Sequence, residues 1–302
     1  MQISQFFLNG DMKGAMAYMR SHEEYKDVLP AYVAIFEDEE YRTYDIPDQL
    51  NDILRCYQVY FRDTFYCGIP EKEAADRLMT GLKALLNMPD AEEDLLAQKL
   101  QAVFEAQGYH ANFGKTQGYY GPYVWKDTVP VEYSVELPGG TAAYKVNMLR
   151  GFVLRSWMDY LTFGRFGTGG WASPDGTINC IEQAYDLSSE RFLVSLLKHE
   201  AQHTADMKRF PGITSAELEY RAKLVELHYT SDLGLLQKFL SEADEGRPND
   251  DHAMASARIR RGFADTDPTD CSCIQARALE LLGASTKEME EKYGKQSAAC
   301  GG

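Results

Sequence analysis

His199, Glu200 and His203 are the residues of this sequence whose types and spacing could do chemistry. They form the run His-Glu-Ala-Gln-His, inside a segment, 188–210, whose apolar residues recur with helical spacing. On a helix, residues four apart lie on one face, so both imidazoles can bind one metal ion. Glu200 can then take a proton from a water on that ion, which is how zinc sites of this kind hydrolyse amide bonds.

A third protein ligand is needed, because catalytic zinc takes three side chains and keeps one position open. The motif helix is expected to end at Pro211-Gly212, a strong break. A second helix follows at once, with Thr214 or Ser215 as its N-cap, and the tight turn lets it fold back near the first. Three acids remain open as the third ligand: Glu219, Glu217 and Asp206.

Glu219 is the favoured third ligand. Ala222 follows it on the same helix face, and a small residue there would let the two helices approach closely. Glu217 has a structural role available as the capping-box residue of the second helix. Asp206 is more plausible as a hydrogen-bond partner of a ligand than as a ligand. Glu226, two turns beyond Glu219, could support the site in the same way.

His199-Glu200-x-x-His203, followed by a helix that carries Glu219, resembles the gluzincin metallopeptidases. The resemblance covers residues 195–227. It implies a zincin-like metallopeptidase core in which Zn²⁺ is bound by His199, His203 and Glu219. It also implies that Glu200 acts as the general base.

An oxyanion that forms during hydrolysis needs a hydrogen-bond donor besides the metal. Several residues after the motif could donate, and the sequence does not choose among them. They are Tyr220, His228, Tyr229, His252, Arg258, Arg260 and Arg261.

Upstream of the motif the alternation of apolar and polar residues predicts short strands. A strand at 177–181 comes just before the motif helix, and an open strand edge there could pair with an extended substrate backbone. The glycine-rich loop 167–172 could form a rim of that cleft. The other predicted elements are a strand at 122–125, a hairpin of 129–137 and 142–149 with a turn at 138–140, and a helix at 151–163.

The rest of the chain is predicted to be helical, so the fold class is α+β, mostly helical with a small β-sheet. We expect a helical N-terminal region at 1–115 and a zincin-like core with C-terminal helices at 116–302. The N-terminal helices are expected at 11–22, 24–37, 46–64, 71–86 and 91–107, and the C-terminal ones at 232–242, 251–263 and 271–292.

Composition limits the partners and the compartment. The chain has 302 residues and a net charge of −15, which disfavours nucleic acid and anionic membrane surfaces. No run of apolar residues is long enough to span a bilayer, so no membrane association is expected. The beginning of the sequence lacks the pattern of a secretory signal and the six cysteines are scattered, which predicts a cytoplasmic protein with reduced thiols.

The sequence therefore predicts a zinc-dependent peptidase that acts on a peptide or protein substrate. The alternative is a catalytically inactive zincin-like protein that works as a binding or regulatory module. A third possibility is a helical interaction protein in which the motif is accidental. The substrate and the oligomeric state stay open.

Overall fold

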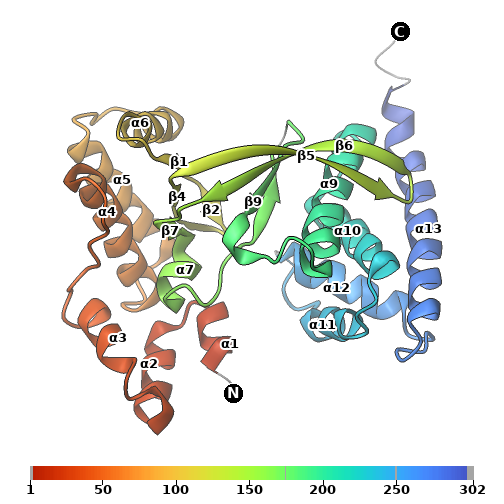
Figure 1. The fold of residues 1–302 in the computed structure, drawn as a ribbon. Helices are drawn as coiled ribbons and strands as arrows, with labels where there is room; N and C mark the ends of the chain where they lie inside the picture. Colours follow the sequence, from red (N-terminus) through yellow and green to blue (C-terminus); the bar gives the residue numbers. More distant parts are fainter. Residues whose placement is uncertain (1–2, 174, 249, 298–302) are drawn as a thin grey trace. The chain divides into compact units, whose positions relative to one another are not determined.

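The structure is a computed structural model that describes residues 3–173, 175–248 and 250–297 (Figure 1). It is mostly helical with small sheets, as the α+β prediction requires. Contacts between Cα atoms divide the chain into two compact units, each built from two segments. Unit 1 is Met1–Asp127 with Arg150–Thr168, and unit 2 is Thr128–Leu149 with Gly169–Gly302. The boundary predicted after residue 115 differs from this division. The long β-hairpin at 128–149 belongs to unit 2, and the segment that follows it, 150–168, returns to unit 1.

Unit 1 begins with helices that each bury one face. In α4, for example, Leu50, Tyr57 and Phe61 are buried, because helical spacing brings them to the same side. The predicted N-terminal helices are present with shifted ends, and α3 starts later because a 3₁₀ turn at Glu23–Tyr25 precedes it. A first short helix was not predicted. The helices are α1 (Ile3–Leu8), α2 (Met12–Arg20), α3 (Leu29–Phe36), α4 (Asp48–Phe65), α5 (Glu71–Leu85) and α6 (Glu93–Ala106).

The remainder of unit 1 has two small sheets and one helix. Strand β4 (Tyr123–Trp125), which was predicted, pairs with β1 (His110–Asn112) on one side and β7 (Leu154–Arg155) on the other. The second sheet joins β2 (Lys115–Thr116) to β3 (Tyr119–Tyr120). The helix predicted at 151–163 is shorter, α7 (Ser156–Thr162), because the two residues before it pair with β4.

Unit 2 has one sheet of four strands, in the order β5-β6-β9-β8. The predicted hairpin is confirmed as β5 (Asp127–Leu137) and β6 (Gly140–Arg150). Strand β9 (Ile178–Ile181) is parallel to β6 and antiparallel to β8 (Gly170–Ala172), and all its residues are buried. The expectation that β9 offers an open edge is therefore wrong. The edge strand beside β9 is β8, which forms within the glycine-rich loop, and β5 lies at the opposite edge.

The helices of unit 2 surround α10, which packs against α9, α12 and α13 (Figure 1). Every residue from 220 to 227 in α10 is buried, as expected of a helix with neighbours on all sides. The helices are α8 (Glu190–Phe192), a π-helical segment (Leu193–Lys198), α9 (His199–Arg209), α10 (Ser215–Tyr229), α11 (Gly234–Glu242), α12 (Asp251–Gly262) and α13 (Cys271–Ser297), with a 3₁₀ turn at Glu182–Ala184 before them.

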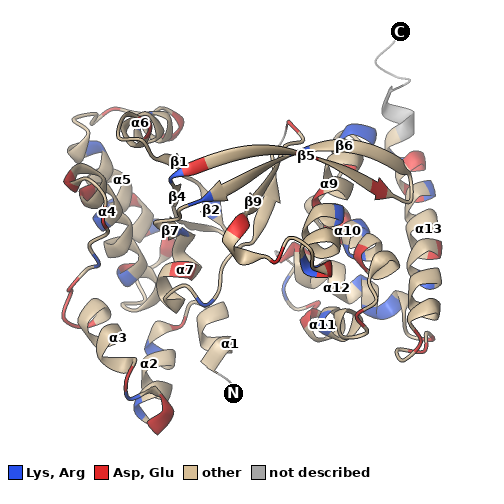
Figure 2. Ribbon diagram, viewed as in Figure 1, with Lys and Arg blue, Asp and Glu red and all other residues tan. Residues whose placement is uncertain are grey.

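Acidic and basic residues are interspersed along α13 and most other helices, whereas α1 and α3 carry none (Figure 2). Within the described residues, no helix combines the length and the apolar character that crossing a bilayer requires.

Candidate metal centre

Helices α9 and α10 are joined by a tight turn that brings their polar residues together. The π-helical segment ends where the motif begins, and such segments occur often at functional sites. After α9 the chain turns at Gly212, whose φ of 88° suits glycine. Thr214 then caps α10 by accepting a hydrogen bond from the Glu217 backbone N–H at 3.3 Å, as predicted.

The structure brings His199, His203 and Glu219 together. One ligand atom from each lies within 4.8 Å of the other two. His199 Nε2 is 3.5 Å from Glu219 Oε2, and His203 Nε2 is 3.7 Å from Glu219 Oε1. Zinc–ligand bonds of about 2.0–2.1 Å in a tetrahedron hold ligand atoms roughly 3.3 Å apart. The three side chains are therefore close to the spacing that a bound zinc ion needs.

Two buried atoms of this group lack a hydrogen bond among the described residues. They are His203 Nε2 and Glu219 Oε2. His252 Nδ1 lies 2.9 Å from that oxygen, an ion-pair distance without the alignment of a hydrogen bond. Buried polar atoms are normally satisfied, and a metal ion between them would satisfy both. The donor set, two imidazoles and a carboxylate, suits zinc.

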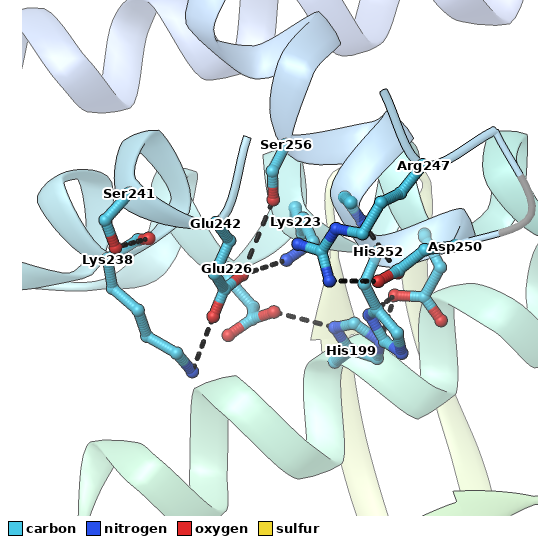
Figure 3. Close-up of polar contacts among 12 residues, drawn as sticks. His199, Lys223, Glu226, Lys238, Ser241, Glu242, Arg247, Asp250, His252 and Ser256 are labelled. Atoms are coloured by element: carbon cyan, nitrogen blue, oxygen red, sulfur yellow. Dashed lines mark hydrogen bonds and ion pairs between the residues drawn. The ribbon is translucent and has the colours of Figure 1, made fainter. Parts of the chain in front are cut away.

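Glu226 orients the first histidine. His199 Nδ1–H donates a hydrogen bond to Glu226 Oε1 at 2.7 Å, and both side chains are buried (Figure 3). The bond leaves Nε2 as the atom that can bind a metal. Burial lowers the pKa of His199, but Glu226, Glu219 and Glu200 outweigh it and raise the pKa to about 9. The supporting role considered for Glu226 fits this geometry.

Glu200 lies beside the ligands and is buried. Its Oε2 is 3.4 Å from His203 Nδ1. Burial raises the pKa of Glu200, but the contact with His203 and the charge of His199 outweigh it, so the pKa lies below its ordinary value. Glu200 is therefore an ionised carboxylate at neutral pH, the form that accepts a proton.

Glu219 is held as an anion more strongly still. Burial raises its pKa, but the contact with His252 and the positive charges of His199 and His203 lower the pKa to about 2. A carboxylate that stays ionised at all ordinary pH values meets the requirement for a metal ligand.

The two competing acids are engaged elsewhere. Asp206 accepts hydrogen bonds from Arg221 at 2.8 and 2.9 Å and from Gln202 at 2.8 Å. The expectation that Asp206 supports a metal ligand is therefore wrong, because its oxygens face α10 and its own helix. The Glu217 carboxylate pairs with Arg258 at 2.9 Å, instead of closing the predicted capping box.

Among the candidate oxyanion donors, His252 is the one that contacts the triad. Its side chain is 61% exposed, so it lies where the group opens to solvent. The others have different contacts. His228 bonds the Gln275 carbonyl, Tyr229 lies under Lys198, Tyr220 lies under Arg258, Arg260 bonds the Ala243 carbonyl and Arg261 pairs with Glu245.

Sequence reasoning missed two buried cations in α10. Arg221 is 3% exposed and holds Asp206, which ties α9 to α10. Lys223 is also 3% exposed, and its ammonium group pairs with Glu242 at 3.0 Å (Figure 3). Their signal in the sequence is weak: they stand among the apolar residues of 220–227, a stretch that Glu226 also interrupts.

Comparisons with protein-family models, with curated proteins and with solved structures gave no match to this chain.

Proposed function

We propose that this protein is a zinc-dependent peptidase with a zincin-like core, in which His199, His203 and Glu219 bind Zn²⁺. The observation that carries the proposal is the buried, unsatisfied Nε2 of His203, which faces Glu219 beside the oriented ring of His199. Two histidines on one helix and a glutamate on the next are the ligand set that zinc peptidases of this kind use.

When bound, zinc polarises a substrate carbonyl and lowers the pKa of a water molecule to about 7. Glu200 takes the proton from the water that attacks the peptide carbonyl, then delivers it to the leaving amine. Glu226 keeps His199 in the tautomer whose Nε2 faces the site. His252 donates a hydrogen bond to the oxygen that becomes negative, since it lies on the open side of the triad.

Strand β8 offers an extended substrate a place to bind. Ile181 N–H donates to the Gly169 carbonyl and Ser173 N–H donates to the Thr177 carbonyl, each at 2.8 Å. Backbone groups alternate sides along an antiparallel strand, so those of Gly170 and Ala172 face away from β9. Because β8 also contacts α9, a peptide added at this edge would run beside the motif helix.

The test combines metal content with peptide cleavage. Elemental mass spectrometry of the purified protein should find one zinc per chain, lost in His203→Ala and in Glu219→Ala. His228→Ala is the matched control and should keep its zinc, because that ring bonds a backbone carbonyl elsewhere. Glu200→Gln should keep zinc and lose cleavage of a peptide library.

Two results would count against the proposal. If the native chain takes up no zinc after zinc is supplied, the motif is accidental. If it binds zinc but cleaves no peptide, the inactive binding or regulatory module is the better description.

A further inference from the structure

Unit 2 contains a cavity of about 620 Å³ that is separate from the metal centre. The cavity is lined by the turn between β5 and β6, by one face of α9, and by parts of α10 and α13. None of the triad residues is in the lining. On α9 the lining residues include Gln202, Ala205 and Arg209, each rotated around the helix by at least about a sixth of a turn from His199 and His203. The volume lies within the range of about 300–1,000 Å³ that small-molecule sites occupy.

The charges of the lining favour an anionic ligand. Both acids in it are already neutralised, Asp206 by Arg221 and Glu290 by Arg209. Lys287 has no ion-pair partner among the described residues. The cavity therefore has one uncompensated positive charge, in a chain whose net charge is −15.

The lining also has an apolar side, formed by residues of two elements. Leu137 and Tyr144 come from the hairpin, and Leu279 and Leu282 come from α13. Leu279 is 44% exposed, so its side chain can contact a ligand in the cavity. Leu279 and Lys287 lie on the same face of α13, two turns and about 12 Å apart along the helix axis.

We infer that this cavity binds a small amphipathic carboxylate, with its charged group at Lys287 and its hydrocarbon chain along Leu282 and Leu279. The charge of Lys287 selects the anion, and the apolar side buries the chain away from water. The distance between the two ends of the site suits a medium-length chain such as decanoate. The inference does not depend on metal binding or peptidase activity, because no metal ligand takes part.

Isothermal titration calorimetry of the full chain with decanoate tests the site. We expect saturable binding of one decanoate per chain. Lys287→Glu and Leu279→Glu should each weaken binding by at least about tenfold, since one removes the cation and the other makes the apolar side anionic. Both positions are exposed, so the variants should fold, and circular dichroism checks this.

Lys292→Glu is the matched control. It makes the same charge change on α13 outside the lining and should leave binding within about twofold of the native value. Decyltrimethylammonium has the same chain with the opposite charge and should bind weakly. The inference is wrong if decanoate does not saturate the native chain, if both probes bind equally, or if Lys287→Glu and Lys292→Glu have the same effect.

Discussion

The buried ion pair between Asp206 and Arg221 should be essential to unit 2, and Arg221→Met tests this. Both side chains are 2–3% exposed, and the guanidinium group bonds both carboxylate oxygens at 2.8 and 2.9 Å. Methionine fills much of the same volume but leaves the carboxylate buried with Gln202 as its one remaining side-chain partner among the described residues. Removing one member of such a pair costs about 3–5 kcal/mol, because the remaining charge is uncompensated.

A surface pair provides the matched control. Arg209 also lies on this side of α9, but it and its partner Glu290 are each about half exposed. Arg209→Met should therefore cost no more than about 1 kcal/mol. The free energy of unfolding of both variants can be measured by urea titration with circular dichroism.

A double variant separates charge from packing. If the uncompensated carboxylate causes the loss, Asp206→Asn combined with Arg221→Met should be more stable than Arg221→Met alone. The reasoning is refuted if Arg221→Met and Arg209→Met destabilise the protein equally. It is also refuted if the double variant recovers nothing, since packing of the arginine would then account for the loss.

Three further predictions concern the metal centre and its surroundings. Zinc affinity should rise about tenfold per pH unit up to about pH 9. Below the raised pKa of His199 the imidazole holds a proton that zinc must displace. Chelator competition at several pH values measures the affinity, and a flat profile would contradict the prediction. His252→Ala should keep zinc and lower kcat by about 10²–10³, and a rise in KM alone would show that this ring only binds substrate. Gly170→Ala places a Cβ 2.4 Å from the Asn179 carbonyl oxygen, so it should cost about 1–3 kcal/mol of stability and reduce peptide cleavage. Gly167→Ala meets no atom within 4 Å and should change neither stability nor cleavage. Equal effects of the two variants in unfolding and cleavage assays would show that β8 does not bind the substrate.

Local patterns in the sequence were enough to predict the hairpin and most of the helices, though not the short α1. The helices that carry the motif and Glu219 both follow from apolar spacing, from the break at Pro211-Gly212 and from the cap at Thr214. These signals lie within a few residues of the structure they specify. The order of strands in a sheet depends instead on segments far apart in the sequence. The position of β9 inside the sheet and of β8 at its edge could therefore not be predicted.

The sequence by itself determined which side chains could form a metal site, because a spacing of four places His199 and His203 on one helix face in any fold. Only the tertiary structure decided which acid joins them, since Glu219, Glu217 and Asp206 differ in what the packed helices place beside them. Arg258 holds Glu217 and Arg221 holds Asp206, while Glu219 is left facing the two imidazoles. Arg221 lies 15 residues from Asp206 and Arg258 lies 41 residues from Glu217, so the packing of separate helices brings each pair together.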